Sequence, residues 1–130
     1  TISLMDINSE RLAWAKKGVE KLIAAGKRSA KVEASLDRAE ALKDADVVLT
    51  DSGGLQEETT AMHVPCVTIR ENTERPVTVS MGSNILAGIR QDSIVEAYRS
   101  ARQRGKSGTV PPYWDGKAAE RIWDVLLKVH

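Results

Sequence analysis

Residues 46–58, which read DVVLTDSGGLQEE, decide the fold of this chain. The segment 46–50 is an apolar run typical of a strand that is buried on both faces. Two glycines then turn the chain into a helix, whose first turn is expected to hold Glu57 and Glu58 because the helix dipole favours acids there. A strand that leads directly into a helix is the repeating unit of α/β proteins.

Strand and helix patterns alternate on both sides of this segment. Apolar spacing, capping residues and the positions of Gly and Pro delimit the neighbouring elements. We expect strands over residues 1–5, 31–34, 64–69 and 84–87, helices over residues 8–26, 35–43, 53–62, 93–105 and 118–129, and a turn of helix from Pro76. Because strand–helix–strand crossovers are right-handed, the alternation predicts an α/β fold with helices on both faces of a parallel sheet.

The C-terminal helix carries a single apolar stripe. An exposed stripe would forgo about 1.5 to 3 kcal/mol for each large side chain, so we expect the helix to pack back onto the sheet. Three tryptophans supply most of the aromatic area and are also expected to pack in the core. The stripe is Ile122, Val125, Leu126 and Val129, and the tryptophans are Trp14, Trp114 and Trp123.

The composition is that of a soluble globular domain. The chain has 130 residues, of which 42% are hydrophobic and 28% are charged. A net charge of +1 disfavours nucleic acid and anionic membranes as partners, and the sequence holds no apolar run of membrane-spanning length. A single cysteine, Cys66, and a start without the features of a secretory signal favour a reduced, cytoplasmic setting.

The turn from Ser52 through Gly53 to Gly54 is the strongest candidate for a ligand site. Glycines let a ligand approach the backbone, and free N–H groups at a helix start attract phosphate. The alternative is that the glycines only make a tight turn. A second candidate is Arg75, which lies in the polar run 72–76 after the next expected strand. Its guanidinium would suit a phosphate. A solvated loop is the alternative there.

The remaining chemically capable residues predict no catalytic or metal site. His63 and His130 have no Cys or carboxylate at ligand spacing, so both are expected at the surface. Asp6 is expected to cap a helix rather than hold a ribose, because no G-x-G-x-x-G motif precedes it. Cys66 is expected to be a small buried apolar residue.

The motifs of the chain resemble two families. From about Asp46 to Leu127 it resembles the C-terminal domain of the non-hydrolysing UDP-N-acetylglucosamine 2-epimerases, through VVLTDSGGLQEE, VPCVTIRENTERPVTV, GSNILAG and DGKAAERI. Residues 1–47, through ISLMDINSERL, KVEAS and DRAEALKDADVV, resemble the NAD-binding region of family 4 glycoside hydrolases of the α-glucosidase and α-galactosidase type. We therefore predict an engineered chimera, a single α/β domain over residues 1–130 with a seam near residues 44–50.

These resemblances imply a topology and a set of ligand residues. A Rossmann sheet that lacks its first strand would close into a five-stranded, three-layer, doubly wound sheet of the flavodoxin-like order 2-1-3-4-5, with residues 46–50 central and 31–34 at an edge. In the epimerases the Ser-Gly-Gly turn, the second Glu of the motif and the Arg of the TERP motif hold the diphosphate and ribose of UDP. The positions that match are Ser52, Gly53, Gly54, Glu58 and Arg75.

Three functional hypotheses remain open at this stage. The first is a chimeric scaffold without catalytic activity, which binds UDP or phosphate weakly at most. The second is a binding module that retains affinity for UDP. The third is an incomplete UDP-N-acetylglucosamine 2-epimerase. The resemblances place the epimerase acid and base mainly on another domain, and the hydrolase signatures for NAD and a divalent metal do not occur here, so we expect no catalytic residue and no cofactor.

Overall fold

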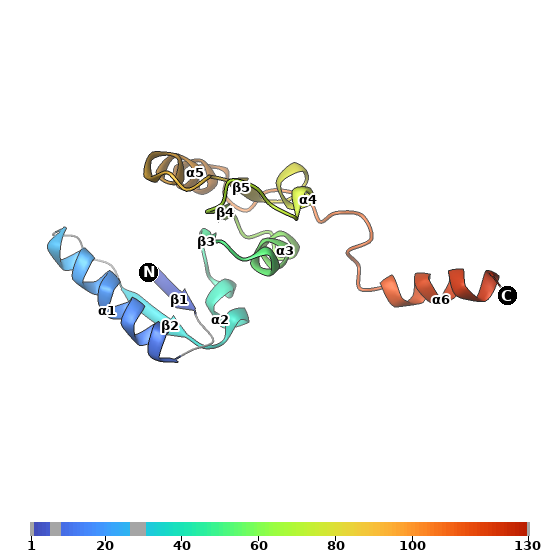
Figure 1. Cartoon of the computed structure of the whole chain (residues 1–130), viewed down its shortest axis with the longest axis horizontal. Coiled ribbons are helices and arrows are strands. Elements are labelled where there is room, and N and C mark those ends of the chain that lie inside the picture. The colour runs from blue at the N-terminus through green and yellow to red at the C-terminus, as the bar shows by residue number, and fades with distance from the viewer. Residues whose placement is uncertain (1, 6–8, 27–30, 130) are drawn as a thin grey trace. The chain divides into compact units, whose positions relative to one another are not determined.

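The computed structural model describes residues 2–5, 9–26 and 31–129. Its contacts divide the chain into two compact units, Thr1–Ala45 and Asp46–His130, and each unit is described by itself. The boundary between the units falls within the seam predicted at residues 44–50. A single domain over the whole chain therefore stays a prediction. Figure 1 labels the helices and strands of both units.

The first unit is a parallel strand pair with two helices. It contains β1 (Ile2–Met5), α1 (Ser9–Ala25), β2 (Val32–Ser35) and α2 (Arg38–Lys43). Strands β1 and β2 pair in parallel, with Ile2 opposite Val32. All four elements were expected, although α2 begins three residues later than predicted, because the carboxylate of Asp37 caps it by accepting from the backbone N–H groups of Ala39 and Glu40. Asp6 and His130 lie outside the described residues.

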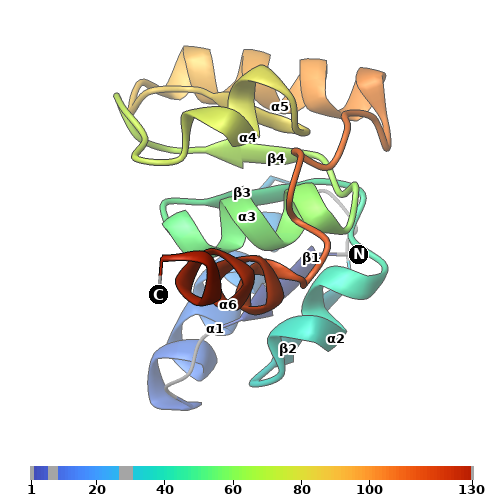
Figure 2. The ribbon, with the colours of Figure 1, turned by 90° about the vertical axis from the view of Figure 1, so that its right-hand side faces the viewer.

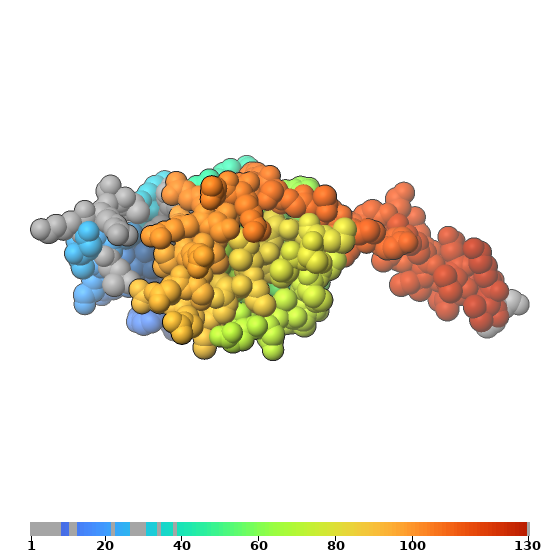
Figure 3. All heavy atoms as spheres, turned by 90° about the horizontal axis from the view of Figure 1, so that it is seen from above, coloured from blue at the N-terminus to red at the C-terminus, as the bar shows by residue number. Residues whose placement is uncertain are grey.

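The second unit is built on a parallel sheet with helices on both faces. Its strands are β3 (Val48–Thr50), β4 (Cys66–Thr68) and β5 (Asn84–Leu86), in the order β3-β4-β5. Its helices are α3 (Gly53–Ala61), α4 (Pro76–Ser80), α5 (Gln91–Arg104) and α6 (Ala118–Lys128). Helices α3 and α4 cover one face and α5 covers the other, as Figures 1 and 2 show. Figure 3 shows one surface of this unit, formed largely by α5 and the segment that leads into α4.

The core of the second unit lies on β4. All three residues of β4 are buried, and Val67 packs against the small side chains Ala87, Ala97 and Ala101. The prediction that β3 is central and buried on both faces is not confirmed, since within this unit β3 is at the edge of the sheet and its Leu49 is 46% exposed. The pairings β1-β2 and β3-β4-β5 agree with parts of the predicted order, but the five-strand order is not confirmed.

The C-terminal helix does not pack as predicted. Every residue of its apolar stripe is exposed, from 52% at Leu126 to 76% at Val129. The sheet faces of this unit are covered by α3, α4 and α5. The tryptophan prediction is also wrong for two residues, because Trp14 and Trp123 are 80% and 62% exposed.

Candidate functional site

The start of α3 lies where β3 ends, at the carboxyl edge of the parallel sheet. Ser52 is the N-cap, with an extended backbone (φ −83°, ψ 127°), and its side chain makes no capping hydrogen bond. The backbone of Ser52 is held by the preceding strand, since the Ser52 N–H donates to Oγ1 of Thr50 at 3.0 Å. The first N–H groups of α3 are therefore left without a side-chain cap, which is the condition for an anion site at a helix start.

The two glycines are the first residues of α3, and their backbone does not require glycine. The described glycines with positive φ lie elsewhere in the chain, and neither Gly53 nor Gly54 is one of them. A Cβ on Gly54 would meet nothing closer than Oγ of Ser52, at 3.9 Å. A left-handed backbone therefore does not explain the two glycines. Gly53 has a packing reason instead, because a Cβ there would lie 2.6 Å from Oε1 of Glu74.

A carboxylate already lies against this helix start. Oε1 of Glu74 would be 2.6 Å from a Cβ placed on Gly53, and its Oε2 accepts a hydrogen bond from Nη1 of Arg70 at 3.1 Å. The hydrogen bond from its own backbone N–H, and then the charge of Arg70, lower the pKa of Glu74, so the group is an anion at neutral pH. Glu74 belongs to the polar run 72–76, in which the sequence pointed to Arg75 as the ligand residue.

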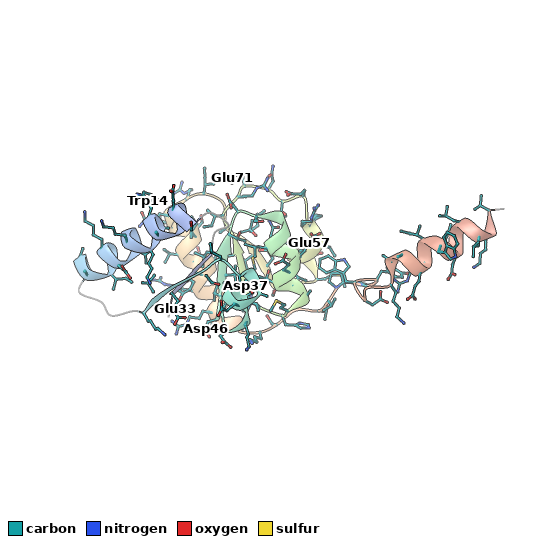
Figure 4. All side chains as sticks on the ribbon, turned by 90° about the horizontal axis from the view of Figure 1, so that it is seen from below. Trp14, Glu33, Asp37, Asp46, Glu57 and Glu71 are labelled. Carbon is teal, nitrogen blue, oxygen red and sulfur yellow. The ribbon has the colours of Figure 1, made fainter. Side chains whose placement is uncertain are left out.

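Arg75 reaches α3 through an ion pair. Its Nε lies 2.8 Å from Oε1 of Glu57, without the geometry of a directed hydrogen bond, and its Nη1 donates to the backbone oxygen of Glu74 at 3.5 Å. Arg75 is also the N-cap of α4, whose first residue is Pro76 as predicted. Figure 4 labels Glu57 on α3. The structure thus brings Arg75 and the helix of the Ser-Gly-Gly turn together.

The two glutamates of the motif lie further along α3 than predicted. Because the helix begins at Gly53, Glu57 and Glu58 fall in its second turn and not in the first. Glu57 is paired with Arg75, and Glu58 is partly buried.

A buried polar network ties α3 to the loop that carries Arg75. Gln56 is fully buried, and its Oε1 accepts hydrogen bonds from Oγ1 of Thr73 at 2.5 Å and from Nδ2 of Asn84 at 3.3 Å. Oγ1 of Thr73 in turn accepts from the N–H of Arg75 at 3.0 Å. Asn84 also donates to Oγ1 of Thr78 at 3.1 Å. Gln56 and Thr73 lie in the two segments predicted to carry the site, but their contact with each other and with Asn84 joins distant segments that no local pattern links.

The other reactive residues do not form a site in the described structure. Cys66 is buried on β4, and burial raises the pKa of its thiol, so the nucleophilic thiolate is disfavoured as expected for an inert cysteine. His63 is exposed, as predicted, with a left-handed backbone (φ 56°). Among the described residues no three metal-ligating side chains gather into a cluster. No described helix combines the length and apolar character needed to cross a membrane.

Comparison with known families identifies one match. A sequence model described as UDP-N-acetylglucosamine 2-epimerase matches residues 14–127. The match begins inside α1 and continues across the seam predicted at residues 44–50. It supports one family on both sides of that seam and lends no support to a glycoside hydrolase family 4 origin of residues 1–47.

Curated relatives match about two thirds of this chain. The UDP-N-acetylglucosamine 2-epimerase of Methanocaldococcus jannaschii is 44% identical over 84 residues, which are 65% of this chain and 23% of that protein. The UDP-2,3-diacetamido-2,3-dideoxy-D-glucuronate 2-epimerase of Pseudomonas aeruginosa is 39% identical over 88 residues, which are 68% of this chain and 25% of that protein. The chain therefore spans about a quarter of the length of these relatives.

Solved structures of epimerases share the fold. The M. jannaschii UDP-GlcNAc 2-epimerase in complex with UDP-GlcNAc and UDP matches with a TM-score of 0.62 and 26% identity, over 98% of this chain and 44% of that one. The Neisseria meningitidis UDP-GlcNAc 2-epimerase bound to UDP-GlcNAc matches with a TM-score of 0.61 and 23% identity, over 98% and 44% respectively. The fold is thus α/β and Rossmann-like.

Proposed function

Because this chain belongs to the UDP-N-acetylglucosamine 2-epimerase family, we propose that residues 46–130 bind the diphosphate and ribose of a UDP-sugar. The observation that carries the proposal is the start of α3, which has no side-chain cap from Ser52 and where the backbone of Gly53 and Gly54 does not require glycine. A site of this kind suits an anion that accepts several backbone hydrogen bonds at once.

In this proposal the diphosphate lies at the N-terminal end of α3. Its oxygens accept from the backbone N–H groups of Gly53 and Gly54 and from the hydroxyl of Ser52, which is exposed. The positive end of the helix dipole adds a favourable charge interaction. The carboxylate of Glu74, which lies against Gly53, must move aside for the diphosphate to bind.

Arg75 and Glu58 complete the proposed ligand set. The guanidinium of Arg75 is partly exposed and its planar fork suits a phosphate, so it is proposed to exchange part of its pairing with Glu57 for the diphosphate. Glu58, one turn into the same helix, is proposed to accept hydrogen bonds from the ribose hydroxyls, since a carboxylate is a pure acceptor.

Epimerisation itself is proposed to need more than this chain. The relatives are about four times longer than the matched part, and none of Ser52, Gly53, Gly54, Glu58 and Arg75 is assigned to proton transfer. We therefore expect binding without turnover by this chain, and activity only when the remaining part of an epimerase is supplied. An epimerisation assay with and without an added N-terminal domain of a relative tests that expectation.

The binding proposal is tested by NMR titration of the chain with UDP. We expect saturable shifts of the Gly53 and Gly54 amides with a dissociation constant of about 1 mM or weaker, because half of a two-sided site loses both contacts and orientation. Gly53→Val should abolish the shifts, since the side chain would cover the helix start. Gly18→Val is the matched control, because Gly18 also lies in a helix and a Cβ there meets nothing within 4 Å.

The alternative is that the second unit binds no UDP at the start of α3. It predicts no saturable UDP shifts at Gly53 and Gly54, or shifts that survive Gly53→Val. Either result would overturn the nucleotide-binding proposal.

A further inference from the structure

We propose that Gln56 and Thr73 are positioning residues, which hold the backbone of Arg75 in place and so set how tightly the site binds a nucleoside diphosphate. This inference rests on the proposed function and names two residues outside its ligand set. The hydroxyl of Thr73 donates to Oε1 of Gln56 at 2.5 Å. The Oγ1 atom of Thr73 also accepts from the N–H of Arg75 at 3.0 Å. One hydroxyl therefore links the helix of the Ser-Gly-Gly turn to the residue proposed to neutralise the phosphate.

The carbonyl of Arg75 is held by the same network. Oγ1 of Thr78 donates to the Arg75 carbonyl oxygen at 2.7 Å and accepts from Nδ2 of Asn84 at 3.1 Å. Nδ2 of Asn84 also donates to Oε1 of Gln56 at 3.3 Å. Both polar groups of the Arg75 backbone are thus tied to side chains that converge on the amides of Gln56 and Asn84.

The network is anchored in the buried part of the second unit. Oδ1 of Asn84 accepts from Oγ1 of Thr68 at 2.7 Å, and Thr68 is a fully buried residue of β4. Gln56, Thr78 and Asn84 are each at most 2% exposed. Hydrogen bonds in such a dry environment are directional and costly to break, so they fix the loop more firmly than apolar contacts would.

Stability alone does not explain the network. Nε2 of Gln56 is buried and has no hydrogen-bond partner among the described residues, which costs stability that an apolar side chain of the same size would not. A buried polar group that is only partly satisfied is a poor choice for a core. It is a good choice for holding a loop at one distance from a helix, because the hydrogen bond specifies both partners and their separation.

The test compares two substitutions of Thr73 in the full chain, with UDP and inorganic pyrophosphate as probes. Thr73→Val removes the hydroxyl and should weaken the binding of both probes about fivefold to tenfold, as the loss of one positioning hydrogen bond would. Thr73→Ser keeps the hydroxyl and should restore affinity. Thr59→Val is the matched control. The Thr59 hydroxyl is also buried, on α3, but it donates to the carbonyls of Leu55 and Gln56 and not to the loop that carries Arg75.

A double-mutant cycle separates positioning from a general loss of structure. If Thr73 acts through Arg75, Thr73→Val should have no further effect on affinity in an Arg75→Ala background. The inference is overturned if Thr73→Val leaves affinity unchanged while Arg75→Ala weakens it, if Thr59→Val is equally harmful, or if the effect persists without Arg75. If the unmodified chain binds neither UDP nor pyrophosphate, the proposed function fails and the inference fails with it.

Discussion

Nε of Arg75 lies 2.8 Å from Oε1 of Glu57, so the cation proposed to meet the phosphate is already paired with a carboxylate on α3. Both side chains are about 40% exposed, and an ion pair at that exposure is weak and exchangeable. The pair therefore orients the Arg75 side chain toward α3 and leaves its guanidinium able to exchange Glu57 for another anion.

Glu57→Gln should strengthen the binding of UDP. The substitution keeps the size of the side chain and removes the charge that competes for Arg75, so we expect affinity to rise about twofold to fivefold. NMR titration with UDP measures the change. Glu96→Gln on α5 alters the net charge equally on the opposite face of the sheet. An equal gain from Glu96→Gln would show a long-range charge effect and contradict the proposed competition.

Glu74→Gln should also strengthen the binding of phosphate compounds. Oε1 of Glu74 lies against Gly53, where a bound anion would come to rest, and the loss of its charge should raise the affinity for pyrophosphate about fivefold. Isothermal titration or NMR measures the effect. Glu71→Gln is the control, because Glu71 is on the same loop but lies near Gly88. Unchanged affinity in Glu74→Gln would place the anion elsewhere.

The burial of β4 predicts an unusual order of core substitutions. Val67→Ala should lower the free energy of unfolding by about 2 kcal/mol, since Val67 is fully buried. Leu49→Ala removes a larger side chain but should cost less than about 1 kcal/mol, because Leu49 on the edge strand β3 is 46% exposed. Urea denaturation of the full chain compares the two. A larger loss of unfolding free energy for Leu49→Ala than for Val67→Ala would indicate that Leu49 is buried and that β3 is a central strand.

The start of α6 should respond to acid in a narrow range. Nη1 of Arg121 donates to Oδ1 of Asp115 at 2.9 Å, and together with the N–H of Lys117 the arginine lowers the pKa of Asp115 from 3.8 to about 2. A lowered acid pKa contributes stability above the ordinary value, and that contribution is lost as the pH falls from about 4 through about 2. The helical amide shifts of α6 should therefore change in that window and stay constant above it.

Two variants check the assignment of this titration. Asp115→Asn should remove the acid response, and Asp124→Asn, which alters an exposed acid on the same helix, should leave it. Tyr113 supports the same guanidinium, since its ring centroid lies 5.1 Å from Cζ of Arg121. An acid transition that persists in Asp115→Asn would refute the role of the pair.

The sequence by itself determined the kinds of elements and their order. Glycine, proline and apolar spacing act within a few residues, so the patterns located every strand and helix of the described structure to within a few positions. The same local signals placed the Ser-Gly-Gly turn at the end of β3 and Pro76 at the first position of α4. The motifs from Asp46 onward also indicated the epimerase family, which the family match confirms.

Only the tertiary structure decided which strand is buried and which residues meet. DVVLT is the more continuous apolar run, yet β4 is central because it is the strand that pairs on both sides. Gln56 and Thr73 are seventeen positions apart, and Glu74, on the same loop as Thr73, lies against Gly53 at the start of α3. Such contacts depend on how helices and loops pack on the sheet, which no local pattern encodes. The apolar stripe of α6 likewise predicts burial, yet its side chains are exposed. An amphipathic pattern indicates that a helix has an apolar face, but it does not specify which surface covers that face.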